Sequence, residues 1–351
     1  MKGEKLEGLQ EKYQAFDEVC LVASGKYRRY HGQSFLAHLI DVKTLLLNIR
    51  DFFRVSRGIF SAKRQLKRIK PDVVFSKGSY AAVPVGIAAH RLGIPIITHD
   101  SDAVPGLANR ILARWAVVHA VGQPVENYDY PKGKLVFTGI PVDEHIKPVS
   151  EAQQRTFKRE LALPEDSLVL LVAGGGLGSG YMNDLISKTA PELLKQQPRL
   201  RIIIIAGQQH QAEASEAYQR MPEAEGRVSV LGFTPDFYKY SGAADLILCR
   251  AGASTLAEFA LQRKPIVVVP AAHLTGGHQL ANVKQLQELV AAEVLDSQVT
   301  PEELLKVLNQ LLQNKRGREA LGDKLGTLAQ PQAAEKLAQL ILHVAESGVG
   351  T

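Results

Sequence analysis

The chain alternates between short apolar runs and longer segments in which apolar residues recur with helical spacing. Runs of about four to eight almost continuously aliphatic residues are typical of strands that are buried on both faces of a parallel sheet. The alternation of such runs with helices predicts doubly wound α/β domains. The apolar runs are 71–76, 94–99 and 134–139 in the first part of the chain, and 167–174, 201–207, 228–233, 245–250 and 265–270 in the second.

A weak internal repeat indicates two domains of the same type. DVVFSKGSYAAVPVGIAAHRLGIPIITH (72–99) and DLILCRAGASTLAEFALQRKPIVVVP (245–270) both have an Asp-led strand, a basic residue, small residues, a helix and a second strand after proline. The segment 139–153 carries Pro, Gly and charges, so we expect the switch between domains there. The last helical pattern fits either domain by itself. We assign residues 1–142 with 333–351 to the first domain, and 143–332 to the second.

Length and composition are consistent with this organisation. A chain of 351 residues suits two domains of about 150 residues each. The net charge of +6 fits an anionic ligand, a membrane surface or nucleic acid. Two distant cysteines, Cys20 and Cys249, form no disulfide framework and favour a reducing cytosol. No apolar run reaches the roughly 18–20 residues of a membrane span, and the N-terminus lacks the apolar region of a signal peptide.

The segment Leu45–Lys70 concentrates positive charge. It sets many Lys and Arg residues against a single acid, Asp51, and interleaves them with apolar residues that include Phe52, Phe53 and Phe60. A basic amphipathic helix with aromatic residues fits an anionic membrane surface. A core helix with a solvated basic face fits equally well. Nucleic acid is not expected as a partner, because the charge is local and no recognisable reading motif accompanies it.

Two turns rich in small residues follow predicted strands. AGGGLGSG (173–180) lies between a strand and a helix, where backbone N–H groups and the helix N-terminus can approach a phosphate. A tight turn without a ligand is the alternative. AGAST (251–255) follows the strand that ends at Arg250, and its helix carries one charge, Glu258. An ionised carboxylate there can accept bonds from two ribose hydroxyls, or it can simply compensate the helix dipole.

Further polar residues follow two other strands. The loop after 265–270 contains His273, His278, Gln279 and Asn282. A metal site there lacks a Cys or an acid, so contacts to sugar hydroxyls are the better fit. THDSDAVPGLANR (98–110) brings acids, His99 and Asn109 to a strand terminus, where open α/β sheets bind ligands. Its Asp-Ser-Asp also matches a short metal-holding pattern, although turn-forming acids explain it as well.

These pieces together resemble the MurG-type glycosyltransferases over residues 20–345. The resemblance rests on ADLILCRAGASTLAEFALQRKPIVVVP with HLTGGHQLAN, on SKGSYAAVPVGIAAHRLGIPIITHDSDAVPGLANRILA, and on AGGGLGSGYMND. It implies two Rossmann-like domains in the GT-B arrangement with the substrate cleft between them. It also implies inverting transfer of GlcNAc from UDP-GlcNAc to the lipid-linked muramyl-pentapeptide in peptidoglycan synthesis. The enzyme would lie peripherally on the cytoplasmic face of the membrane and need no cofactor or obligatory metal.

The resemblance also assigns roles to residues of this chain. Glu258 would bind the ribose, Phe233 would lie near the uracil, and Gln279 with its neighbours would hold the GlcNAc. His99 or Asp100 would be the general base that takes the proton of the acceptor hydroxyl. On the acceptor side it implies Tyr80, Asp102 and Asn109. The implied donor-side residues are Gly174, Gly175, Gly176, Gly178, Asn183, Phe233, Arg250, Ala251, Gly252, Ser254, Thr255, Glu258, His278, Gln279 and Asn282.

The sequence also departs from the family. The first strand and the glycine-rich loop ending in His that open family members are not found, so we expect a truncated or misassigned start. Gly176-Leu177 replaces Ser-Gln, and Asp143 replaces an Arg. Asp100 and Asp102 stand where the family tends to have Glu and Asn. Two alternatives remain: a GT-B transferase with another lipid acceptor, and a degenerate UDP-sugar-binding subunit that needs a partner.

Overall fold

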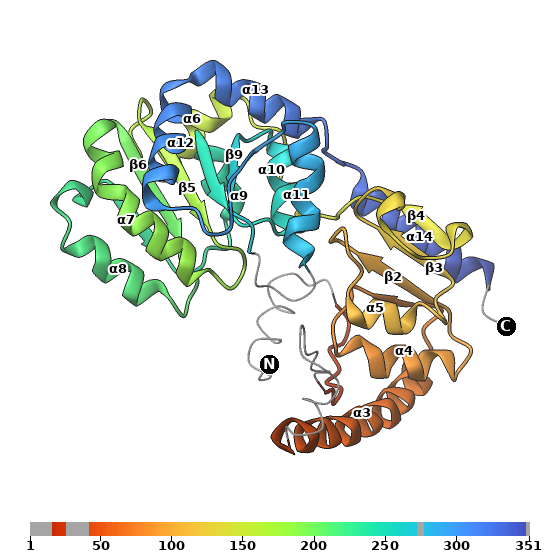
Figure 1. Cartoon of the computed structure of the whole chain (residues 1–351). Helices are drawn as coiled ribbons and strands as arrows, with labels where there is room; N and C mark the ends of the chain where they lie inside the picture. The colour runs from red at the N-terminus through yellow and green to blue at the C-terminus, as the bar shows by residue number, and fades with distance from the viewer. Residues whose placement is uncertain (1–15, 26–41, 272–276, 349–351) are drawn as a thin grey trace.

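The structure is a computed structural model that describes residues 16–25, 42–271 and 277–348, without the side chains of 42–49. Two parallel sheets organise these residues (Figure 1). The eight apolar runs predicted as strands all form strands, so this part of the prediction is confirmed. The sequence missed β3 and β10, because His119 interrupts the apolar run of β3 and β10 is only two residues long.

The first sheet has the order β1-β2-β3-β4 within the described residues, and all of its pairs are parallel. Ala62 and Leu66 of α3 pack with Ala88, Ala89 and Ile96 in its core. The elements are α3 (Val42–Ile69), β1 (Val74–Ser76), α4 (Ala82–His90), β2 (Ile96–Asp100), α5 (Leu107–Leu112), β3 (Val118–Val121), the 3-10 turns η1 (Val125–Asn127) and η2 (Lys132–Lys134), and β4 (Leu135–Phe137).

The second sheet has the order β10-β9-β8-β5-β6-β7 and is also parallel throughout. Its elements are α6 (Glu151–Glu160), β5 (Leu168–Ala173), α7 (Gly180–Gln196), β6 (Leu200–Ile205), α8 (Gln211–Gln219), η3 (Pro222–Ala224), β7 (Val228–Leu231), α9 (Phe237–Ala243), β8 (Leu246–Cys249), α10 (Ala253–Gln262), β9 (Ile266–Val268), α11 (His278–Glu288), β10 (Glu293–Val294), α12 (Pro301–Gln313) and α13 (Lys315–Gly326).

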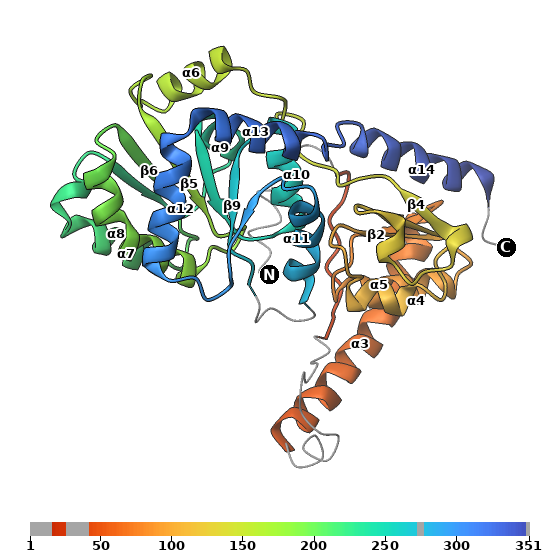
Figure 2. The same cartoon turned by 45° about the horizontal axis from the view of Figure 1, so that its top comes forward.

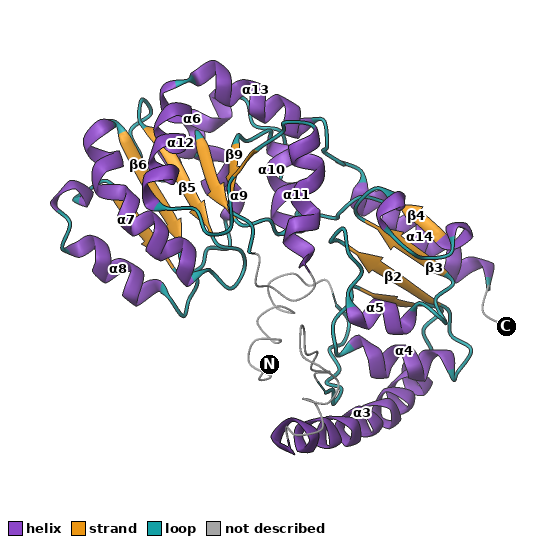
Figure 3. Cartoon of the chain, in the orientation of Figure 1, coloured by secondary structure: helices purple, strands orange, loops and turns teal. Residues whose placement is uncertain are grey.

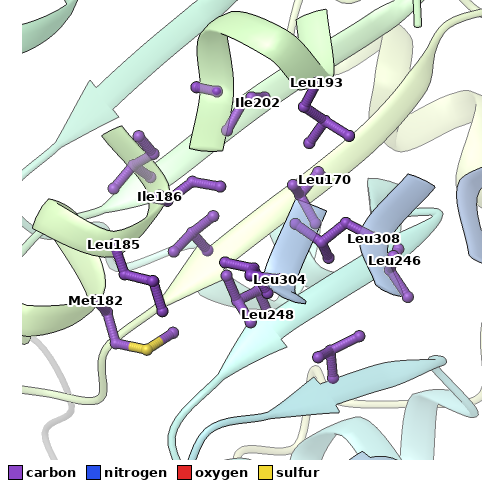
Figure 4. Packing of buried hydrophobic residues seen from close by; sticks show 14 of the residues in the cluster. Leu170, Met182, Leu185, Ile186, Leu193, Ile202, Leu246, Leu248, Leu304 and Leu308 are labelled. Atoms are coloured by element: carbon purple, nitrogen blue, oxygen red, sulfur yellow. The ribbon is translucent and has the colours of Figure 1, made fainter. Parts of the chain in front are cut away.

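Helices cover both faces of the second sheet (Figure 3). Leu170 of β5 points to one face and packs with residues of α7 and α12, such as Leu193 and Leu308 (Figure 4). Leu171, the next residue, points to the other face and packs with α10 and α11. Successive residues of a strand point to opposite faces, so a strand covered on both sides must be apolar at every position. This explains the continuous apolar runs.

The last helix, α14 (Ala333–Ser347), lies beside the first sheet (Figures 1 and 2). The chain returns to the first sheet at Gln330, close to Gly139, where a Cβ would stand 2.7 Å from the Gln330 Cβ. The predicted repeat also has the same architecture in both sheets. β1-α4-β2 and β8-α10-β9 each join two adjacent parallel strands through one helix.

Helix α3 projects away from the rest of the molecule (Figure 2). One face is buried: Val55, Gly58, Ala62 and Leu66 recur at helical spacing and point toward the domain. Gly58 is required there because a Cβ would collide with the Ala23 carbonyl of the preceding segment. The opposite side is exposed. It carries Phe53 and Phe60, with exposed fractions of 62% and 78%, and two arginines between and beyond them.

Candidate active site

The candidate site lies at the carboxyl ends of β5, β8 and β9. Strand order reverses at β5, since β6 lies on one side of it and β8 on the other. Ligands of open α/β sheets bind outside the carboxyl ends of the strands at such a switch point. Three segments meet here: the glycine-rich loop before α7, the small-residue turn before α10, and the end of β9 at Val269 and Pro270.

The glycine-rich loop has a backbone that needs glycine at two positions. Gly175 and Gly178 take φ values of +90° and +75°, and the Gly178 N–H donates to the Gly175 carbonyl at 2.9 Å. A Cβ at Gly178 would also collide with the Ala206 carbonyl, whereas Gly176 faces open space. Ser179 caps α7 by accepting from the Met182 N–H at 3.3 Å. The unpaired N–H groups of the first turn of α7 therefore face the same opening as the loop.

Arg250 connects these turns. Its Nη1 donates to the Val269 carbonyl at 3.0 Å, and its Nη2 donates to the Ser179 hydroxyl at 3.2 Å. The guanidinium also lies over the Tyr181 ring, 4.9 Å from the ring centroid. Arg250 thus supports the cap of α7 and the end of β9 from the end of β8. A basic residue after β8 was found from sequence, but its partners Ser179 and Tyr181 were not.

Glu258 lies in the second turn of α10, one turn after Ser254 and Thr255. Within residues 16–25, 42–271 and 277–348, no hydrogen bond reaches its carboxylate. Burial, and secondarily the charge of Asp143, raise the pKa of Glu258 to about 7. A carboxylate that only compensates a helix dipole gains nothing from desolvation. The structure therefore favours a carboxylate that awaits hydrogen-bond donors from a ligand.

The N-terminal turn of α11 contains the three predicted sugar contacts. The Gln279 Oε1 accepts from the Ala271 N–H at 2.8 Å, which leaves its amide N–H groups for a ligand. His278 is largely buried, and its Nδ1 has no hydrogen-bond partner in the described part of the chain. Predicted His273 lies outside the described residues.

Asn282 was predicted to hold the sugar, but in the structure its amide already has partners within the protein. Its Oδ1 accepts from the Ala103 N–H at 2.9 Å, and its Nδ2 donates to the Asp102 Oδ1 at 2.9 Å and to the Ala251 carbonyl at 3.0 Å. The amide therefore makes two contacts to the first domain and one within the second. Through these hydrogen bonds, Asn282 connects the loop after β2 of the first domain with the turn before α10 of the second.

The predicted general bases, His99 and Asp100, lie in the core of the first domain. His99 is fully buried, and its Nε2–H donates to the Gly139 carbonyl at 3.0 Å. The Asp100 carboxylate accepts from Tyr130, from the Gly106 N–H and from Asn109 at 2.9–3.1 Å. Burial raises the pKa of Asp100 and lowers that of His99. Both side chains therefore hold the loop after β2 in place through hydrogen bonds within the protein, and their role as the general base stays a prediction.

Two other predicted ligand contacts also have structural roles. Asn109 is buried and donates to the His99 carbonyl and to Asp100, while its Oδ1 accepts from Ser76. Asn183 donates to the Ala206 carbonyl at 3.1 Å and so fixes the end of β6 against α7. Both amides are therefore committed within the protein. Side-chain amides are frequent ligand contacts, and the sequence offers no signal that separates the two uses.

Three more of the predicted residues are accessible, whereas predicted Ala251 is fully buried. Phe233 follows β7 and is 63% exposed, and Tyr80 follows β1 and is 54% exposed. Asp102 is half-exposed at the boundary between the domains. The sequence analysis overlooked Tyr128 and Tyr130, which hold the loop 100–102 through the Asp102 carbonyl and the Asp100 carboxylate. Tyr128 and Tyr130 stand two residues apart in the segment after β3, a strand that the sequence analysis had also missed.

The described residues contain no group of three His, Cys, Asp or Glu side chains placed to hold a metal ion. None of the described helices is long and apolar enough to cross a membrane.

Comparison with known proteins identifies the family. Residues 18–120 match the glycosyltransferase family 28 N-terminal domain, and residues 169–340 match the C-terminal domain of that family. The chain is 36% identical over 293 residues to the UDP-N-acetylglucosamine--N-acetylmuramyl-(pentapeptide) pyrophosphoryl-undecaprenol N-acetylglucosamine transferase of Acinetobacter baumannii, covering 82% of this chain and 77% of the relative. The Bacillus licheniformis protein of the same name is 31% identical over 291 residues, covering 83% and 78%.

Solved structures support the same family and show the same fold. The crystal structure of Acinetobacter baumannii MurG superposes with a TM-score of 0.62 at 32% identity, covering 83% of this chain and 80% of that one. A UDP-GlcNAc 2-epimerase from Neisseria meningitidis shares the fold, with a TM-score of 0.63 at 15% identity, covering 82% and 81%. With its two parallel-sheet domains in the GT-B arrangement, the chain therefore belongs to glycosyltransferase family 28 and is a MurG-type glycosyltransferase.

Proposed function

We propose that the protein transfers GlcNAc from UDP-GlcNAc to the N-acetylmuramyl-pentapeptide linked through pyrophosphate to undecaprenol. Glu258 carries this proposal: its partly buried carboxylate has no hydrogen-bond donor among the described residues, and it lies on the helix that follows the small-residue turn 251–255. An ionised carboxylate can accept both hydroxyls of a ribose, which suits a nucleoside diphosphate sugar. The names of the Acinetobacter and Bacillus relatives support the choice of donor and acceptor.

The donor would extend across the carboxyl ends of the second sheet. The loop around Gly175 and Gly176 and the N-terminus of α7 would hold the diphosphate through backbone N–H groups. Exposed Phe233 would offer a face for the uracil, and the Gln279 amide would donate to the GlcNAc. These groups would stabilise the departing UDP without an obligatory metal or cofactor.

The reaction would be a single inverting displacement. The acceptor hydroxyl oxygen attacks the anomeric carbon while the bond from that carbon to the diphosphate oxygen breaks, and UDP leaves with the electron pair. The hydroxyl proton passes to a base in the cleft. Tyr80 and Asp102 would face the acceptor, because both are accessible on the first domain.

Helix α3 would bind the anionic surface of the cytoplasmic leaflet. Phe53, Arg57, Phe60 and Arg64 recur at i, i+4, i+7 and i+11, which places them on one exposed side of the helix. Aromatic rings would enter the interface while the guanidinium groups meet lipid phosphates. The alternative interpretation, a core helix with a solvated basic face, does not account for two exposed phenylalanines on that face.

A transfer assay tests the proposal. The full chain is mixed with radiolabelled UDP-GlcNAc and vesicles that contain the lipid-linked muramyl-pentapeptide, and the lipid product is quantified. We expect labelled disaccharide lipid with wild type and a large loss with Glu258→Gln. Glu213→Gln, at an exposed acid near the start of α8, is the matched control. Transfer to diacylglycerol instead, or donor binding without transfer to any lipid, would refute the proposal.

A further inference from the structure

A cavity of about 310 Å³ lies between the two domains, and we call it the interdomain cavity. Helices α10 and α11 face the first domain (Figure 2) and form one wall of the cavity, which includes Ala257 and Gln285. The opposite wall belongs to the first domain, where Gln123 follows β3 and Phe137 ends β4. The volume lies at the lower end of the range of small-molecule sites.

The interdomain cavity also touches both segments that connect the domains. Ile140 lies in the segment between β4 and α6, and Leu328 and Gln330 lie in the segment between α13 and α14. A change in the angle between the domains turns the chain at these two crossings, so it also changes the shape of the cavity. A molecule bound there can therefore act on domain movement.

Three side-chain amides line the cavity without protein partners. Within residues 16–25, 42–271 and 277–348, the amides of Gln123, Gln285 and Gln330 make no hydrogen bond, and all three residues are half-buried. They come from the first domain, the second domain and a connecting segment. Each amide offers N–H donors and a carbonyl acceptor, and a polar group that is partly withdrawn from water is stabilised by a hydrogen-bond partner.

The lining of the cavity is uncharged. None of the described residues that line it is Asp, Glu, Lys, Arg or His, and most of those without an amide are apolar, such as Leu256, Leu261 and Leu286. An ion that entered would lose hydration without gaining a partner of opposite charge. The lining therefore disfavours a nucleotide and favours an uncharged molecule that has an apolar ring and groups that both donate and accept hydrogen bonds.

The interdomain cavity differs in position from the donor site. Among the described residues predicted to bind the donor, Asn282 is the one that lines the cavity, and its amide already has partners. Ala253, Ala257 and Ala260 recur at i, i+4 and i+7 and turn one side of α10 toward the cavity, whereas Glu258 lies on a different side of the helix. UDP and a molecule in the cavity can therefore be bound at the same time.

We propose that the interdomain cavity is a second ligand site, which takes an uncharged molecule with carboxamide-type groups on an apolar ring. The occupant bridges Gln123 of the first domain, Gln285 of the second and Gln330 of the connecting segment. It thereby holds the domains at one angle and lowers turnover without competing with UDP-GlcNAc. Binding at this site is independent of the proposed function, whereas the effect on turnover rests on it.

Isophthalamide, an uncharged ring with two carboxamides, tests the binding by ligand-observed NMR with the full chain. For a ligand of about 12 non-hydrogen atoms we expect a Kd of about 1–10 mM. Isophthalate, the dianion of similar shape, should bind at least about tenfold more weakly. Gln285→Leu combined with Gln330→Leu should weaken isophthalamide binding by about 10–30-fold. Gln287→Leu, at an exposed residue of α11 outside the cavity, is the matched control.

Donor binding and turnover complete the test. UDP affinity by calorimetry should be the same in the double variant as in wild type, which shows that the variant is folded, and the same with and without saturating isophthalamide. In the transfer assay, isophthalamide should lower kcat and leave the donor KM unchanged.

The inference is overturned if isophthalamide shows no saturable binding, if isophthalate binds as well, or if the double variant binds isophthalamide like wild type. Competition with UDP, or an unchanged kcat at saturation, would also overturn it. If wild type transfers no GlcNAc while the binding results hold, the proposed function fails and the ligand site stands.

Discussion

Replacing Glu258 with Gln should make the protein more stable at alkaline pH and a poorer binder of UDP. Burial raises the pKa of Glu258 from 4.5 to about 7, so the folded state disfavours the charged form. The sign follows from linkage. The favourable contribution of the protonated acid is complete below pH 4.5 and is lost as the pH rises through 7. Gln removes the charge, so the variant should gain stability over wild type only above that range.

The size of the stability effect follows from the same shift. A rise from 4.5 to about 7 corresponds to at most about 3 kcal/mol between the two forms. Partial exposure, and the buried amide that Gln leaves without a partner, reduce the gain to about 1 kcal/mol. For domains of this size, about 1 kcal/mol raises Tm by about 2–4 °C. Differential scanning calorimetry should therefore show such a rise at pH 8.5 and none at pH 4.

Ligand binding should change in the opposite direction. Hydrogen bonds to a charged group contribute about 1.5–3 kcal/mol each, and the Gln amide oxygen can still accept from one ribose hydroxyl. The loss of the other contact should therefore weaken UDP binding by about 10–100-fold at pH 8. Because only the ionised acid accepts both hydroxyls, wild-type affinity should rise between pH 6 and 8, and binding near pH 7 should release protons. Isothermal titration calorimetry in two buffers of different ionisation enthalpy measures both effects.

Glu213→Gln should leave the Tm and the UDP affinity unchanged at every pH, because this acid is exposed. The reasoning fails if Glu258→Gln binds UDP as tightly as wild type at pH 8. It also fails if wild-type binding releases no proton near pH 7.

Three further changes test other parts of the structure. Gly178→Ala forces a side chain onto a residue at φ +75° and into the Ala206 carbonyl, so it should destabilise the second domain by more than about 1 kcal/mol and weaken UDP binding, as denaturant unfolding and calorimetry would show. Asn282→Ala removes two hydrogen bonds between the domains and one within the second domain, and should lower stability by about 2–3 kcal/mol; an unchanged urea midpoint would contradict this role of Asn282. Arg57→Gln with Arg64→Gln should weaken sedimentation with anionic vesicles by about 30-fold, at about 1 kcal/mol per charge, without affecting neutral vesicles.

Much of the fold could be predicted because its signals are local. A strand covered on both faces must be apolar at each position, so β5 and β6 were evident without any knowledge of their partners. The glycine-rich loop was evident for a similar reason, because Gly175 and Gly178 take backbone conformations that favour glycine. The two-residue strand β10 carries too short a pattern, and it exists only because β9 offers an edge.

The use of each polar residue in the site could not be predicted in this way. Asn282 and Asp102 are far apart in sequence, and their contact arises only when two domains pack. No local pattern states that the Asn109 amide will be consumed by Ser76 and Asp100, or that His99 will be fully buried.

The sequence by itself therefore determined the two α/β sheets, the turns that precede α7 and α10, and the positions of the polar residues at strand termini. Each depends on neighbours within a few residues or on one repeating period. Only the tertiary structure decided which polar groups remain available: it buried His99 and Asp100, committed Asn282 to the loop after β2, and left the Glu258 carboxylate without a hydrogen-bond donor among the described residues. The physical reason is that burial and hydrogen-bond saturation depend on long-range packing, which local periodicity does not specify.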